Sequence, residues 1–123
     1  MPSVLNEGRR TGEFLVSEAS GYRSRDQGQL MTDEPLPAGT VLGRITATGT
    51  FVPLNPGADD GGETPAAILY ANAEASESSQ PATVILRDAE VNAHCLEWPA
   101  AISEAEQAAA EAALTAAGLI PRR

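Results

Sequence analysis

Residues Thr40-Val41-Leu42-Gly43-Arg44-Ile45 form a stretch that is rich in β-branched and aliphatic side chains. Such a composition is typical of a strand, and the turn-forming run Pro35 to Gly39 stands directly before it. Further along, Phe51-Val52-Pro53-Leu54 follows a loop that contains Gly49. Together these features predict a β-hairpin at the start of a folded body.

Two further apolar runs continue the same pattern. Ala66 to Ala71 and Pro81 to Arg87 each predict a strand, and the turn-rich run Asn55 to Gly62 before them predicts a surface loop. The polar alternation of Asp88 to Asn92 ends the second run, and His94 to Trp98 closes the β region. The body is therefore predicted to be mainly β, a small barrel or sheet with a core of Val41, Ile45, Val52, Ile68, Tyr70, Val84, Leu86 and Trp98.

The C-terminal segment has a different character. Ser103 is followed three residues later by Glu106, which is the signature of a capping box, and an alanine-rich run of strong helix formers comes next. Gly118 can end such a helix and Pro121 cannot continue it. A short α-helix over about residues 102–118 is predicted.

Residues 1–32 are polar, rich in glycine and mixed in charge, with a single apolar cluster at Phe14-Leu15-Val16. Alone, such a segment buries too little apolar surface to become ordered. It is either a disordered tail or an extended arm that becomes a strand on the sheet edge of a partner. We divide the chain into this N-terminal arm, residues 1–32, and a β-rich domain, residues 33–123, that includes the helix.

Length and charge limit the possible functions. The chain has 123 residues, which predicts one domain, and its formal charge of −9 argues against a nucleic-acid surface. All eight cations are arginine, and four of them precede residue 26, so the ends of the chain are basic and the middle is acidic. No apolar stretch approaches the ~20 residues of a membrane span. The single cysteine, Cys95, cannot form an internal disulfide, as is typical of a protein made in a cytoplasm.

The sequence predicts no catalytic, cofactor-binding or metal-binding residues. On a strand, His94 and Cys95 would point to opposite faces and could not act as a base and a nucleophile. The acidic loop around Asp59 and Glu63 lacks the regular ligand spacing of a calcium loop. The absence of lysine excludes a phosphate-binding loop of the lysine-containing type and a lysine-attached biotin or lipoate. The protein is therefore not expected to be an enzyme.

The order and spacing of several sequence blocks resemble the head decoration proteins of tailed phages, the lambda-type protein D group. The resemblance covers roughly residues 12–120. Two blocks lie in the arm and four in the body; they are Glu13 to Glu18, Gly21 to Asp26, Leu36 to Gly43, Pro65 to Tyr70, Val84 to Val91, and Leu96 to Pro99. No single block is specific, and the match depends on their order within a short chain.

This resemblance implies a β-clip-like fold and a homotrimer that binds the major capsid protein on the outer surface of an icosahedral head, at local three-fold positions. Such a protein is structural, needs no cofactor, stabilises the shell against DNA pressure, and is made in the host cytoplasm. It is expected to bind neither nucleic acid nor membrane. The alternative is a monomeric β-rich module that binds a ligand or a surface. The expected capsid-binding residues of the arm are Glu13, Phe14, Leu15, Val16, Ser17, Glu18, Tyr22, Arg23 and Arg25.

Overall fold

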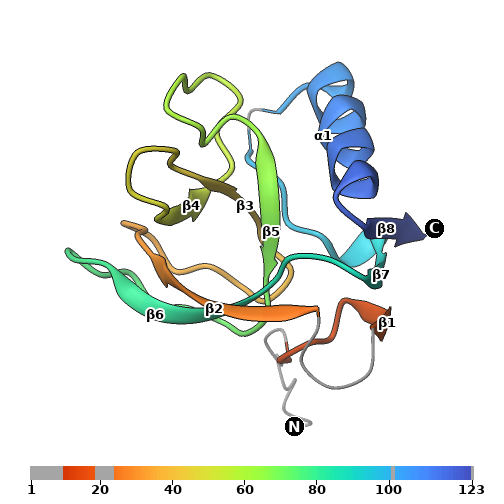
Figure 1. Cartoon of the computed structure of the whole chain (residues 1–123), viewed down its shortest axis with the longest axis horizontal. Coiled ribbons are helices and arrows are strands. Elements are labelled where there is room, and N and C mark those ends of the chain that lie inside the picture. Colours follow the sequence, from red (N-terminus) through yellow and green to blue (C-terminus); the bar gives the residue numbers. More distant parts are fainter. Residues whose placement is uncertain (1–9, 19–23, 101, 123) are drawn as a thin grey trace, which may run out of the picture.

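Two β-sheets and one α-helix make up the computed structural model of the chain, which describes residues 10–18, 24–100 and 102–122. Five strands close into a barrel, and three others form a small sheet that lies beside it with the helix (Figure 1). The fold is thus mainly β with a small barrel and a short C-terminal helix, as the sequence predicts. The elements are β1 Leu15–Glu18, β2 Arg25–Leu30, β3 Val41–Arg44, β4 Phe51–Pro53, β5 Pro65–Leu69, β6 Gln80–Ile85, β7 Ala89–Asn92, the 3-10 helix η1 Ala93–Cys95, α1 Glu104–Ala116 and β8 Leu119–Arg122.

The barrel has the strand order β2-β4-β3-β5-β6. Strands β3 and β4 form the predicted antiparallel hairpin, with Gly43 opposite Val52. Strand β5 pairs antiparallel with both β3 and β6, and β2 pairs antiparallel with the whole of β6. A parallel contact between Leu30 of β2 and Phe51 of β4 closes the barrel.

The second sheet has the order β1-β7-β8, with β1 antiparallel and β8 parallel to the central strand β7. Helix α1 leads into β8 and also packs against β5. The capping box is present, because Ser103 and Glu106 each bond to the backbone of the other. Gly118, with φ of +92°, makes the turn from the helix into β8, where a left-handed backbone favours glycine. The sequence predicts the helix but not β8, because Pro121 indicates only that the helix cannot continue.

Two hydrophobic cores explain why the predicted strands are apolar on both faces. The inner core fills the barrel and takes a side chain from each of its strands, including Leu42 and Leu69. The outer core lies between the barrel, the second sheet and α1, and includes Val41 and Ile68. Because successive side chains of a strand point to opposite faces, β3 and β5 contribute to both cores. Continuous apolar runs are therefore the expected pattern.

The predicted core residues have three different positions. Val41, Ile68 and Val84 are fully buried. Three others are half-buried and pack against one of the cores, namely Tyr70, Leu86 and Trp98. The prediction differs from the structure at Ile45 and Val52, which are half-buried and belong to neither core. Val52 follows Phe51, whose ring points into the barrel, and Ile45 lies beyond the end of β3.

The N-terminal boundary also differs from the prediction. Strand β2 is a member of the barrel, and the side chain of Phe14 is fully buried in the outer core. The described part of residues 1–32 therefore belongs to the folded body, because its strands pair with β7 and β6, fifty or more residues away. His94 and Cys95, which the sequence placed in the closing part of the β region, lie instead in η1, whose turn is capped by a 3.0 Å hydrogen bond from the His94 amide to the Asn92 side chain.

Candidate functional site

The segment Gly12–Glu18, here called the β1 edge, is anchored to the body at its start. The amide of Gly12 donates a 2.8 Å hydrogen bond to the carbonyl of Tyr70, and the amide of Asn92 donates a 2.7 Å bond to the carbonyl of Phe14. Gly12 has φ of +68°, a conformation that favours glycine in the turn that leads into β1. The turn aims the Phe14 side chain into the outer core.

The outer side of β1 is the exposed edge of the second sheet. Among the described strands, β1 pairs only with β7. The register is irregular between Leu15 and Ser17, and Val16, at this β-bulge, is 56% exposed. An edge strand presents backbone N–H and C=O groups that another chain can bind by adding a strand. Within the described residues, the β1 edge thus combines a strand that pairs on one side with an exposed apolar side chain.

Charged side chains fix the end of β1 to the barrel. The Glu18 carboxylate accepts hydrogen bonds from the Ser24 hydroxyl and from the Arg25 guanidinium, whose Nε lies at 3.2 Å. The same guanidinium lies 4.3 Å from the centroid of the Tyr70 ring, a cation–π distance. The hydrogen bond from Arg25 lowers the pKa of Glu18 below its ordinary value, with burial acting in the opposite direction and Ser24 contributing less. Glu18 therefore stays ionised and paired at neutral pH.

A second carboxylate connects the three strands of the second sheet. Glu90 of β7 accepts a 2.7 Å bond from Arg122 of β8 and a 3.0 Å bond from the hydroxyl of Ser17 in β1. Arg122, and then Ser17, lower the pKa of Glu90. The pair is exposed, so it orients the strands more than it stabilises them.

The structure separates residues that the sequence placed in one arm. Phe14 is buried and Leu15 packs against the outer core, whereas Glu13, Val16 and Ser17 are exposed. Glu18 and Arg25 are brought together as an ion pair. Two predicted arm residues, Tyr22 and Arg23, lie outside the described residues.

Sequence reasoning missed the residues that hold this segment. Tyr70 and Glu90 contact it from distant parts of the chain, and Arg122 binds Glu90. The available signal was the apolar pair Leu119-Ile120 after the helix stop, which is compatible with a short strand.

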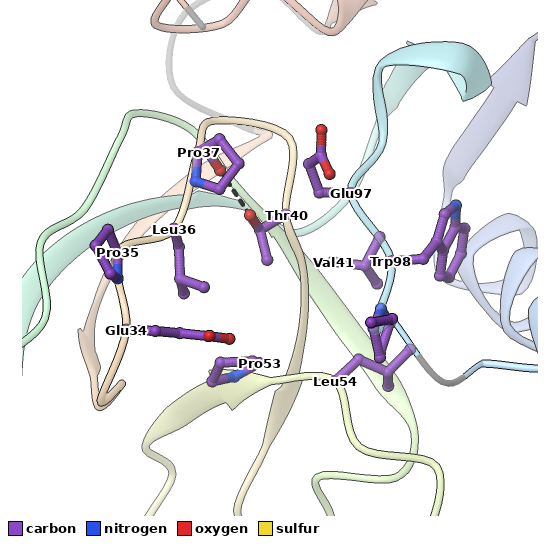
Figure 2. Close-up of a pocket in the computed structure, with 12 residues that line it drawn as sticks. Glu34, Pro35, Leu36, Pro37, Thr40, Val41, Pro53, Leu54, Glu97 and Trp98 are labelled. Carbon is purple, nitrogen blue, oxygen red and sulfur yellow. Dashed lines mark hydrogen bonds between the residues drawn. The ribbon is translucent and has the colours of Figure 1, made fainter. Parts of the chain in front are cut away.

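A cleft of about 370 Å³, here called the proline cleft, lies on another part of the surface (Figure 2). Pro35, Leu36 and Pro37 form one side of it, and Pro53 and Leu54 form another. The remaining lining residues are Glu34, Thr40, Val41, Glu97, Trp98, Pro99 and Ala100. The sequence did not predict this cleft, which is assembled from three separate segments.

The acidic side chains of the described residues do not form a metal site. Within them, no group of three or more histidine, cysteine or acidic side chains could hold a metal ion. Two carboxylates of the acidic loop accept hydrogen bonds from backbone amides of the same loop, Asp60 from Gly62 at 3.0 Å and Glu63 from Gly61 at 2.8 Å. They stabilise the turn. No helix in the described part of the chain is long and apolar enough to cross a membrane.

Comparison with known proteins gives one result. A family model described as bacteriophage lambda head decoration protein D matches residues 4–119. No curated protein matches the chain. The matched region includes all elements from β1 to the start of β8.

Proposed function

We propose, because the chain belongs to the bacteriophage lambda head decoration protein D family, that it binds as a homotrimer at the local three-fold positions of a phage head and stabilises the shell against the pressure of packaged DNA. The family consists of phage head decoration proteins on the surface of the virion capsid, and it is structural rather than enzymatic. The single observation that carries the proposal is the family match over residues 4–119. Synthesis in the host cytoplasm is part of the proposal.

The β1 edge is the proposed contact with the major capsid protein. Its outer backbone can pair with an exposed capsid strand, and Val16 can contact the side chains of that strand. Phe14 has a different role from the one expected of an arm residue, because it anchors the edge to the body. Glu13 and Ser17 are exposed on the same segment and complete the contact. Glu18 and Arg25 hold its far end, and Tyr22 and Arg23 stay candidates.

A trimer makes the contact of the β1 edge strong enough to hold the protein on the capsid. Each backbone hydrogen bond contributes about 0.5–1.5 kcal/mol net, so one short strand binds modestly. Once the first copy of a trimer is bound, the other two act at a high effective concentration. A trimer also carries a formal charge of −27, three times that of one chain. This charge keeps decorated particles apart and keeps the trimer off DNA.

A monomeric binding module is the second candidate function, and the proline cleft is the observation that favours it. Clefts of a few hundred Å³ with apolar walls and a few polar groups are typical of ligand sites. This function predicts a monomer in solution and a ligand in the cleft. The oligomeric state therefore separates the two functions.

Light scattering and co-sedimentation test the proposal. The purified protein should have the mass of three chains, and it should sediment with capsids assembled from the major capsid protein of the same phage. DNA-filled heads should release DNA at a higher temperature when the protein is bound. A monomer that stays in the supernatant would overturn the proposal.

A further inference from the structure

A second hollow adjoins the proline cleft. It has a volume of about 360 Å³ and is here called the Met31 hollow; its lining residues are Met31, Thr32, Asp33, Val52, Pro53, Ser76 and Glu77. Pro53 lines both the hollow and the proline cleft, and Asp33 of the hollow is followed in the chain by Glu34 of the cleft. The two therefore form one continuous surface along β4, here called the β4 groove.

Backbone hydrogen bonds hold the walls of the Met31 hollow in place. The amide of Met31 donates a 2.9 Å bond to the carbonyl of Phe51, and the amide of Ser76 donates a 3.0 Å bond to the carbonyl of Thr32. These bonds join three segments that are separate in the sequence. The hollow is therefore preformed, which lowers the entropy that a binding partner would have to offset.

The hollow contains an exposed apolar side chain that the proposed capsid contact does not use. Among the described residues, two large apolar side chains are exposed, Val16 and Met31. Val16 belongs to the β1 edge, whereas Met31 is 44% exposed and lines the hollow together with Val52 and Pro53. Methionine is a flexible side chain that is common at binding surfaces. The β4 groove thus offers an apolar contact of its own.

The groove offers little backbone for strand pairing. Four of the residues that line the proline cleft are prolines, which have no N–H group. The amides of Val41 and Leu54 already donate, to the carbonyls of Glu97 and Val41, at 3.1 Å each. Figure 2 shows the Thr40 hydroxyl bonded to the Pro37 carbonyl, at 2.6 Å. A partner would therefore be recognised through its side chains.

The charged residues that line the β4 groove all have the same sign. They are Asp33, Glu34, Glu77 and Glu97, and none of the described arginines lines the groove. The first three of these residues are exposed, and Glu34 points into the cleft (Figure 2). Apolar walls with carboxylates beside them are complementary to a segment that combines aliphatic side chains with arginine or lysine.

A second copy of this chain is a poor source of such a segment. The chain contains no lysine and has a formal charge of −9. Every described arginine already interacts within its own chain. These residues are Arg10, Arg25, Arg44, Arg87 and Arg122. The complementary charge is therefore expected from a different protein.

The β4 groove and the β1 edge lie on different parts of the molecule. Figure 1 shows β4 across the barrel from β1. A protein that contacts a capsid through the β1 edge would therefore leave the β4 groove open to another partner.

We propose that the β4 groove binds an extended basic segment of another protein. The aliphatic side chains of that segment contact Met31 and Pro53, and its arginine or lysine side chains contact the three exposed carboxylates of the groove. This inference goes beyond the proposed function. It does not depend on the homotrimer, because a single chain supplies all the residues of the groove.

A synthetic peptide of three Arg-Leu-Pro repeats tests the proposal on the full-length protein. Its prolines keep the peptide extended, and it contains no tryptophan. Trp98, the single tryptophan of the chain, lines the cleft, so its fluorescence reports binding. The peptide should bind saturably at about 0.15 M salt. Peptides with glutamate in place of arginine, or serine in place of leucine, should bind at least about tenfold more weakly.

Charge-matched variants locate the contact. Asp33→Asn combined with Glu34→Gln removes two carboxylates of the groove, and Asp59→Asn combined with Glu104→Gln removes two exposed carboxylates elsewhere. Circular dichroism establishes that both variants are folded. The groove variant should raise the dissociation constant of the peptide at least about tenfold, and the control variant should raise it less than about twofold.

Substitution of Met31 tests the apolar part of the contact. Met31→Ser should raise the dissociation constant about fivefold, because serine removes the apolar side chain from the hollow. Met31→Leu keeps an apolar side chain of similar volume and should bind the peptide as the wild type does.

The possible failures are distinguishable. A wild-type protein that does not bind the Arg-Leu-Pro peptide, or equal dissociation constants for the groove variant and its charge-matched control, would overturn the inference. Peptide binding that begins only where dilution dissociates the trimer would mean that a neighbouring copy covers the groove, which also overturns it. Light scattering decides the homotrimer separately, since peptide binding to a monomer would support this inference and overturn the proposed homotrimer.

Discussion

The amide of Asn92 donates a 2.7 Å hydrogen bond to the carbonyl of Phe14, whose side chain has no exposed surface. This bond joins β7 to the turn before β1, across almost eighty residues of sequence. It makes the N-terminal segment a part of the folded body, and it leaves the opposite side of β1 exposed for a partner.

Replacement of Phe14 by alanine should destabilise the protein strongly. The substitution leaves a cavity in the outer core and should lower the free energy of unfolding by about 3–5 kcal/mol. Urea unfolding followed by circular dichroism measures it. Val16→Ala, two residues away and exposed, should change it by less than about 0.5 kcal/mol. Equal effects of the two substitutions would mean that Phe14 is not part of the core.

Replacement of Val16 by glutamate should weaken capsid binding without unfolding the protein. The side chain is exposed at the β-bulge, and a trimer loses the same contact three times. We expect the concentration needed for half-maximal co-sedimentation with capsids to rise at least about tenfold. Met31→Glu is the matched control, because Met31 is also a large apolar residue and is 44% exposed. It lies away from β1, directly after the end of β2. Binding that falls equally in both variants would argue against the β1 edge.

Replacement of Gly43 by alanine should strain the barrel. A Cβ atom at this position would overlap the backbone of Gly62, including its carbonyl oxygen, so the loop before β5 would have to move. A cost of about 1–3 kcal/mol in the free energy of unfolding is expected, as for an overpacked core. At Gly57 the nearest atom lies 3.6 Å from such a Cβ, so Gly57→Ala should have a small effect. Thermal unfolding of both variants compares them directly.

The ion pair of Glu18 should make stability depend on pH. Its pKa is lowered, mainly by the hydrogen bond from Arg25, so the ionised carboxylate stabilises the folded state above the ordinary pKa of 4.5. This contribution is lost as the pH falls below that value and through the pKa of the folded state. Urea unfolding between about pH 6 and about pH 3 measures this dependence. The free energy of unfolding of Glu18→Gln should decline less over this range than that of the wild type.

Glu90 has a lowered pKa as well, so part of the pH dependence should persist in Glu18→Gln. Glu77→Gln, at an exposed residue, is the control and should decline as the wild type does. An identical decline in Glu18→Gln and in the wild type would exclude a stabilising pair between Glu18 and Arg25.

Local patterns predicted the strands that are buried on both faces. The runs that became β3, β5 and β6 are apolar because each strand places adjacent side chains in two different cores. Val41 and Leu42 of β3 are an example. The capping box at Ser103 predicted the start of α1 for a similarly local reason, since its bonds join residues three apart.

Elements that depend on distant partners were not predictable in this way. Strand β2 has the polar sequence RDQGQL, and its place in the barrel comes from backbone pairing with β6. The burial of Phe14 needs β7 and the turn at Gly39, and the proline cleft needs three segments to meet. No pattern within a short window of sequence contains these contacts.

Electron microscopy of capsids mixed with the purified protein tests the central claim most directly. The account predicts density for three copies on the outer surface at each local three-fold position, with the β1 edge of each copy against the shell. Single copies at other positions, or capsids without added density at protein concentrations above those that form the trimer, would contradict it.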